Sequence, residues 1–178
     1  MFSKKIIVVY KSKTGFTEKY AKWIAEALHC DIVRFDGFNI EQMACYDIVI
    51  LGGGIYAGRI NGANLIKNNA SSFSEKKVIV FATGASAPIP QEIERYEKHS
   101  IPQDMNIEFF YFQSGMNYTR MNGTDKLLMT AFKTILKLKK NKSAVEQGTN
   151  DAIQRSYDYS NINQIDPLVN YAKTIELE

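Results

Sequence analysis

The chain has 178 residues, of which 45% are hydrophobic and 23% are charged. This length allows one well-buried domain and is too short to argue for two. The net charge of +3 and the isoelectric point near 8.7 are too mild to indicate nucleic-acid binding, so we expect no nucleic-acid partner. No run approaches the roughly 18 apolar residues that a membrane span requires, and we expect a cytoplasmic protein.

Five apolar runs of strand length recur along the chain, and most are separated by segments with helical spacing. This alternation, with nearly continuous Val, Ile and Phe in the runs, favours a parallel sheet with helices on both faces, an α/β three-layer sandwich. Five strands in a chain of this length fit the doubly wound order 2-1-3-4-5. The runs are Lys4–Tyr10, Cys30–Phe35, Asp47–Leu51, Lys77–Ala82 and Ile107–Phe112.

A polar turn containing one glycine follows the first run and precedes a helical pattern that includes Tyr20 and Leu28. In such an arrangement backbone N–H groups and the positive end of the helix point at one spot, which suits an anion. Three hydroxyls can add donors there, and each charge-assisted hydrogen bond contributes about 1.5–3 kcal/mol. The alternative is an ordinary strand-to-helix turn with an N-cap threonine. The hydroxyls are those of Ser12, Thr14 and Thr17.

Two further loops of small residues follow the third and fourth runs. Gly52–Gly58 combines glycines, which allow close backbone approach, with the aromatic face of Tyr56, and Thr83–Pro88 offers amides and hydroxyls with little bulk. The carboxyl ends of parallel strands meet at one edge of the sheet, so these loops are expected beside the first one. A dinucleotide fingerprint is excluded, because Ala82 and Thr83 stand where the acidic ribose partner should be.

Two other α/β classes are excluded by single positions. A phosphoacceptor receiver domain needs acidic residues after the first strand and an aspartate at the end of the third, but Lys11 and Gly52 occupy those places. A P-loop nucleotide triphosphatase needs the motif G-x-x-x-x-G-K-[ST], which the chain lacks. The cysteines, Cys30 and Cys45, form no CxxC motif, so we expect two buried free thiols and no metal site.

The segment Val8–Ile24 resembles the FMN-phosphate pattern of the flavodoxins, with its aromatic residue, Ser, Gly, Thr and Ala at the family's positions. The resemblance implies FMN as cofactor, its phosphate on the first loop and its isoalloxazine between the other two, with Tyr56 the candidate for stacking. The implied phosphate ligands are Ser12, Lys13, Thr14, Gly15, Phe16 and Thr17. The implied ring neighbours are Gly53, Gly54, Ile55, Tyr56, Ala57, Gly58, Thr83, Gly84, Ala85, Ser86 and Ala87.

Beyond the fifth run the chain is similar to one branch of that family, the flavodoxin-type, menaquinone-dependent protoporphyrinogen dehydrogenases. The shared features are the turn Phe112–Tyr118, a long helix opened by Asp125, and a polar stretch before a last helix at about 163–174. The resemblance implies a single flavodoxin-like domain over residues 1–178, with a branch-specific segment at about 115–160. Candidates for a fourth cofactor-side turn are Gly115, Asn117 and Tyr118.

The segment 124–141 predicts an amphipathic helix with apolar residues on one face and lysines on the other side and at the tail. One interpretation is a stable helix packed on the domain. The other is a cationic helix that rests on anionic lipid at the inner face of the membrane, close to a membrane quinone. The apolar residues are Leu127, Leu128, Ala131, Phe132, Ile135 and Leu136, and the lysines are Lys126, Lys133, Lys137, Lys139 and Lys140.

The resemblance implies an FMN-dependent oxidoreductase that oxidises protoporphyrinogen or a similar small molecule with a quinone acceptor. The flavin then carries the redox chemistry, and since no Ser/His/Asp or paired-carboxylate constellation is present, no catalytic residue is assigned. Two alternatives remain open: an electron carrier that serves a redox protein partner, and a binding domain without cofactor. The weakly basic charge is unlike that of the acidic flavodoxin carriers.

Overall fold

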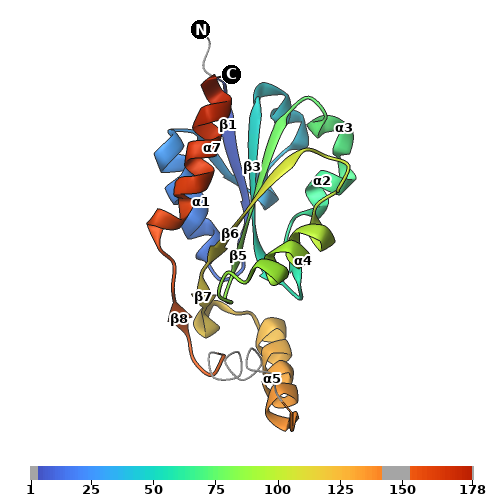
Figure 1. The fold of residues 1–178 in the computed structure, drawn as a ribbon, viewed down its shortest axis with the longest axis vertical. Coiled ribbons are helices and arrows are strands. Elements are labelled where there is room, and N and C mark those ends of the chain that lie inside the picture. Colours follow the sequence, from blue (N-terminus) through green and yellow to red (C-terminus); the bar gives the residue numbers. More distant parts are fainter. Residues whose placement is uncertain (1–3, 142–152, 178) are drawn as a thin grey trace.

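The computed structural model describes residues 4–141 and 153–177. A parallel sheet of order β2-β1-β3-β5-β6 lies at the centre, with helices on both faces (Figure 1). The predicted fold class and strand order are therefore confirmed. The strands are β1 (Ile6–Lys11), β2 (Asp31–Arg34), β3 (Ile48–Tyr56), β5 (Lys77–Gly84) and β6 (Ile107–Gln113).

Alternate residues of each buried strand face opposite helical layers, as the two-residue period of a strand requires. In β1, Ile6 and Val8 belong to the core that α1 (Phe16–Leu28) and α7 (Asp166–Leu177) cover. Ile7 and Val9 belong to the core on the opposite face. The helices there are α2 (Asn64–Asn68), α3 (Ala70–Phe73) and α4 (Pro90–Ser100).

The third strand runs further than the sequence predicted, because Gly52–Tyr56 continues the strand instead of forming a loop. Gly52, Gly53 and Gly54 pair with Phe81, Ala82 and Thr83 of β5. Ile55 and Tyr56 then pair with the short antiparallel strand β4 (Arg59–Ile60). Backbone pairing with both neighbours outweighs the low strand propensity of glycine here, and Thr83–Gly84 likewise belongs to β5.

A separate unit follows the sheet. Strands β7 (Gly115–Met116) and β8 (Tyr157–Asp158) pair antiparallel and flank α5 (Gly123–Leu138), which projects from the body of the molecule (Figure 1). The predicted helix 124–141 is thus present and ends earlier. The predicted last helix is also present, as η4 (Ile162–Ile165) followed by α7. The other 3-10 helices are η1 (Phe35–Gly37), η2 (Ile40–Cys45) and η3 (Tyr118–Arg120).

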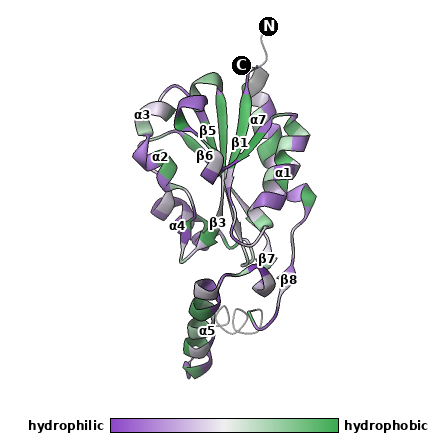
Figure 2. Cartoon of the chain, turned by 180° about the vertical axis from the view of Figure 1, so that it is seen from behind, coloured by the Kyte–Doolittle hydropathy of each residue, from purple (hydrophilic) through white to green (hydrophobic). Residues whose placement is uncertain are grey.

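Some apolar residues of α5 are buried against the rest of the protein, and others are exposed to solvent. Leu136 is buried in a small core with Met116 and Ile153, whereas Leu127 and Ile135 are 71% and 65% exposed. Figure 2 shows hydrophobic residues along α5, which stands clear of the sheet. No helix among the described residues is long and apolar enough to cross a membrane.

The expectation of two buried thiols is wrong for one of them. Neither Cys30 nor Cys45 forms a disulfide, but Cys45 is exposed and Cys30 is half-buried. Cys45 ends the 3-10 helix η2 at the surface, so the apolar strand that follows it in the sequence does not bury it.

Candidate functional site

The loop after β1 turns sharply at Gly15, which has a φ of +94° and caps the N-terminus of α1. A residue with a Cβ rarely adopts this left-handed conformation, so glycine suits the turn. The Gly15 N–H donates to Ser12 Oγ at 3.1 Å, which leaves the Ser12 hydroxyl proton available to an external acceptor. The first amides of α1 have no partner within the helix, as at any helix N-terminus. Anion binding by this loop stays a prediction, and the observed turn has the backbone geometry that the prediction requires.

Thr17 is not at the surface of this loop. Its side chain is buried and its hydroxyl is hydrogen bonded to the hydroxyl of Thr83 at 2.8 Å. The pair ties the start of α1 to the end of β5, and both hydroxyls lie beside the bare Cα of Gly54 in β3. The role of Thr17 as a direct phosphate ligand stays a prediction, while its structural role is to connect three of the expected site segments.

Lys13 connects the loop to two other elements. Its ammonium lies 3.0 Å from Asp125 Oδ1, in the first turn of α5, and 3.5 Å from the ring centroid of Tyr56. Tyr56 is 38% exposed at the end of β3, where the hairpin turn formed by Ala57 and Gly58 begins. The ammonium of Lys13, a predicted phosphate ligand, therefore contacts the ring of Tyr56, the residue predicted to stack on the flavin.

Arg120 is a charged residue at this site that the sequence analysis missed. A Cβ atom added to Gly15 would overlap Arg120 Nη1 and would lie 3.4 Å from Cζ, so the guanidinium covers the turn of the loop. Arg120 lies at the end of η3, where its N–H donates to Asn117 Oδ1 at 3.3 Å. No local pattern signals this contact, because 105 positions separate the two residues in the sequence.

The loop after β5 is held in place by two tyrosines. Tyr111 donates its hydroxyl to the Ser86 carbonyl at 2.8 Å, and Tyr157 donates to the Ala85 carbonyl at 3.3 Å. Burial raises the pKa of the Tyr111 phenol well above its ordinary value, so it stays a donor at neutral pH. Ser114 N–H also donates to the Gly84 carbonyl at 2.7 Å. These hydrogen bonds fix the backbone of Thr83 to Ala87, which lies at the same edge of the sheet as the loop that follows β1.

The three candidates beyond the fifth strand of the sheet have structural partners. Gly115 pairs with Asp158 so closely that an added Cβ would overlap the Tyr157 carbonyl oxygen. Asn117 caps η3, and Tyr118 donates its hydroxyl to the Ile153 carbonyl. Direct contact of these residues with a cofactor stays a prediction. Their observed effect is to fix the short helix that carries Arg120.

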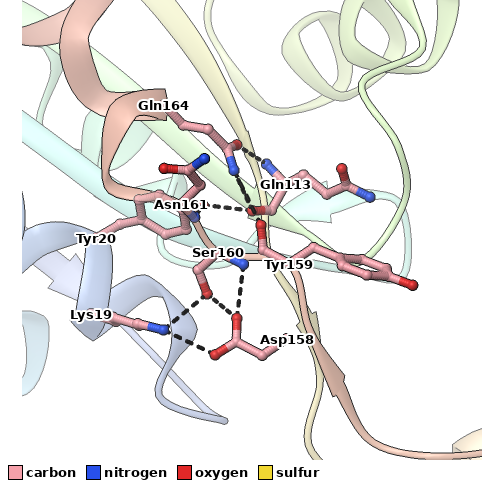
Figure 3. Close-up of polar contacts among 8 residues, drawn as sticks. All are labelled: Lys19, Tyr20, Gln113, Asp158, Tyr159, Ser160, Asn161 and Gln164. Carbon is pink, nitrogen blue, oxygen red and sulfur yellow. Dashed lines mark hydrogen bonds and ion pairs between the residues drawn. The ribbon is translucent and has the colours of Figure 1, made fainter.

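A polar cluster closes the open edge of the sheet beside the site (Figure 3). The side-chain amide of Gln164 accepts from Gln113 N–H at 2.7 Å and donates to the Gln113 carbonyl at 3.2 Å, as a neighbouring strand would. The Tyr20 hydroxyl donates to the same carbonyl at 2.6 Å. Lys19 forms an ion pair with Asp158 at 2.9 Å, which ties α1 to the strand β8.

Within residues 4–141 and 153–177, no group of three His, Cys, Asp or Glu side chains is placed to hold a metal ion. The features that the structure places along this edge of the sheet are a glycine turn at a helix N-terminus, the half-exposed ring of Tyr56 and backbone with small residues.

Comparisons with known proteins give both a sequence relative and structures of similar fold. Over 80 residues the chain is 34% identical to the uncharacterized protein MJ0298 of Methanocaldococcus jannaschii, a match that spans 44% of this chain and about half (53%) of that protein. It is similar in fold to a putative flavoprotein of Bacteroides eggerthii (18% identity, 76% of this chain, 99% of that chain, TM-score 0.47). It is also similar to a flavoprotein of Lactobacillus acidophilus solved with FMN (15% identity, 62% and 93%, TM-score 0.46).

A family model described as a flavodoxin domain matches residues 7–143. This range contains all five parallel strands, the anion-binding turn, both small-residue segments and α5. The match covers more than half of the chain and includes the loop after β1, the glycines of β3, the loop after β5 and η3. The chain therefore belongs to the flavodoxin domain family.

Proposed function

We propose that the protein binds FMN at this sheet edge and works as a flavin-dependent oxidoreductase. The observation that carries the proposal is the left-handed turn at Gly15, which opens the N-terminus of α1 toward a guanidinium. Membership of the flavodoxin family supplies the kind of anion, a flavin phosphate. The residues fit the group, because the Ser12 hydroxyl, the first amides of α1 and the Arg120 guanidinium lie around the turn at Gly15. When bound, FMN supplies the electron transfer.

The residues of the chain then bind and orient the flavin. Ser12 and Thr14 donate their hydroxyls to the phosphate, together with the amides of Lys13, Gly15 and Phe16. Each such bond to a charged group contributes about 1.5–3 kcal/mol. The half-exposed ring of Tyr56 offers a face for stacking on the flavin. The backbone after β5 would border the flavin ring on its opposite side. No proton transfer is assigned to a side chain.

The substrate we propose is a protoporphyrinogen-like or similar small reductant, with a quinone as acceptor. This finer proposal rests on the resemblance beyond the fifth strand and on the exposed apolar face of α5. Leu127 and Ile135 lie on that face, and lysines follow at the end of the helix. An apolar face with basic residues binds anionic lipid surfaces. Because Asp125 joins the first turn of α5 to Lys13, a membrane held by α5 lies close to the flavin site.

The flavin assignment is tested by titrating the apoprotein with FMN while its fluorescence is recorded. We expect binding by the wild type and at least a tenfold weaker affinity for Thr14→Ala, since a charge-assisted bond is lost. Thr130→Ala is the matched control, because that hydroxyl lies on α5 and donates only to the Lys126 carbonyl. A protein that cannot be reconstituted with FMN overturns the proposal.

The reaction is tested with the reduced holoprotein under anaerobic conditions. A menaquinone analogue, protoporphyrinogen and a small redox protein are added separately, and the flavin absorbance is followed. We expect rapid reoxidation by the quinone and, with the oxidised holoprotein, flavin reduction by protoporphyrinogen. Electron exchange with the redox protein alone identifies an electron carrier and overturns the proposed enzyme.

The membrane contact is tested by sedimentation with vesicles of phosphatidylglycerol and phosphatidylcholine. We expect binding by the wild type and loss of binding by a Leu127→Gln/Ile135→Gln double variant. The control Thr130→Gln adds a glutamine to the exposed surface of α5 on the side away from Ile135 and should bind normally. Wild-type protein that stays in the supernatant, or equal binding after all five lysines of the segment 124–141 are changed to glutamine, contradicts the proposal.

A further inference from the structure

We propose that Arg120 is a phosphate-binding residue of the flavin site and makes the site selective for FMN over riboflavin. The inference rests on the proposed flavin binding and adds a residue from outside the β1 loop. It assigns a ligand-binding role to η3, which the fold does not need for its central sheet.

The position of Arg120 is the first argument. Its guanidinium fills the space that a side chain on residue 15 would occupy, with Cζ and Cδ at 3.4 and 3.7 Å from a Cβ built there. Gly15 is the residue at which the backbone turns into α1, so its surroundings are where the amides of the helix N-terminus are directed. The charged group of Arg120 and these amides therefore face the same small volume.

The state of the guanidinium is the second argument. Among the residues that the structure describes, no carboxylate lies within ion-pair distance of Arg120. The nearby carboxylate, Glu18, is instead 2.7 Å from Lys22 Nζ. That hydrogen bond lowers the pKa of Glu18, and the more distant charge of Arg120 acts in the same direction with less effect. The planar donor fork of Arg120 is thus directed at the loop without a protein anion to neutralise it.

The contacts that hold η3 in place are the third argument. Asn117 Oδ1 accepts hydrogen bonds from both Arg120 N–H and the Thr119 hydroxyl, at 3.3 and 2.7 Å. Tyr118 N–H donates to Ser156 Oγ at 3.1 Å, and Lys133 of α5 lies over the Tyr118 ring. These four contacts hold the backbone from which the Arg120 side chain extends. Preorganisation of this kind lowers the entropic cost of binding a phosphate.

The proposed selectivity for FMN over riboflavin follows from the negative charge of the phosphate. FMN differs from riboflavin by the terminal phosphate, and a guanidinium forms its strong, bidentate bonds only with such an anion. Arg120 therefore adds affinity for FMN and none for riboflavin. Its contribution also decreases with added salt, because the group is exposed and its interaction is screened.

The experiment compares dissociation constants of FMN and riboflavin for wild type, Arg120→Gln and Arg120→Lys. We expect Arg120→Gln to raise the FMN constant by about tenfold or more and to leave the riboflavin constant within about twofold. Arg120→Lys should be intermediate, because it keeps the charge and loses the fork. Arg95→Gln is the control for net charge, since Arg95 pairs with Glu92 on α4.

Circular dichroism and thermal melting establish that each variant is folded. Unchanged FMN affinity in folded Arg120→Gln overturns the role of Arg120 while the proposed flavin site stands. Equal weakening of FMN and riboflavin also overturns it, because the effect then does not involve the phosphate. A wild-type protein that binds neither flavin overturns the proposed function itself, and this inference with it.

Discussion

Lys13 and Asp125 form an ion pair of 3.0 Å that joins residues 112 positions apart in the sequence. The Asp125 side chain is only 9% exposed, whereas that of Lys13 is 39% exposed. A carboxylate removed from water needs a partner, so the contact fixes the first turn of α5 against the β1 loop. It links α5 directly to the turn that follows β1.

We expect this link to appear in a double-mutant cycle with Lys13→Met and Asp125→Asn. Each single variant should lower the free energy of unfolding, and the coupling energy should be about 0.5–1.5 kcal/mol, because one partner is partly solvated. Urea denaturation measures these values. Hydrogen exchange of the amides of residues 124–128 should accelerate in both single variants. A coupling energy of zero would mean that α5 is held by its apolar contacts alone.

The buried hydroxyl pair of Thr17 and Thr83 gives a second prediction. Thr17→Val leaves the Thr83 hydroxyl buried without its partner and should destabilise the protein by about 1–3 kcal/mol. Thr83→Val should do the same. The double variant removes both polar groups, so its loss should be smaller than the sum of the two. Additive losses in chemical denaturation would argue that the hydroxyls do not depend on one another.

The ion pair of Lys19 and Asp158 predicts a dependence on pH. Burial works to raise the pKa of Asp158, but hydrogen bonds from Ser160 and Lys19 together hold that pKa below its ordinary value. A depressed pKa in the folded state stabilises the fold above the ordinary aspartate pKa, about 3.9, and this contribution is lost as the pH falls through the folded value.

The variant Asp158→Asn tests this dependence. At pH 7 the wild type should be more stable than the variant, and the difference should shrink below about pH 4 as the aspartate is protonated. Thermal melting of both proteins from pH 7 to pH 3 measures it. A stability difference that stays constant over this range would show that the charge of Asp158 does not matter to the cluster in Figure 3.

The hairpin that carries Tyr56 offers a stabilising substitution. Ala57 and Gly58 connect β3 and β4 with φ values of +48° and +77°, the signs that a type I′ turn requires at both positions. Alanine is strained in this region, whereas Asn-Gly is the favoured pair. Ala57→Asn should therefore raise stability by about 0.5–1 kcal/mol. The melting temperature of Ala57→Asn against Ala57→Val, which we expect to be destabilising, tests the assignment.

The order of the sheet could be predicted from the sequence because the signals are local. Continuous β-branched runs such as Ile6–Tyr10 alternate with helical spacing such as Tyr20–Leu28, and this alternation leaves few topologies open. The turn at Ser12–Thr17 was found for the same reason, since a glycine and hydroxyls between a strand and a helix are neighbours in the chain. The extent of β3 could not be predicted from the sequence, because the pairing of Gly52–Gly54 with β5 depends on a strand 29 residues away.

By itself the sequence determined the α/β class, the strand order and the position of the glycine turn between β1 and α1, because hydrophobic periodicity and turn residues are visible along the chain. Only the tertiary structure decided which side chains meet there. It turned Thr17 inward to Thr83, set Arg120 over Gly15 and buried Leu136 while leaving Leu127 exposed. Each of these outcomes depends on a partner residue that is distant in the sequence and close only in the folded protein. The spacing of residues along the chain does not identify such a partner.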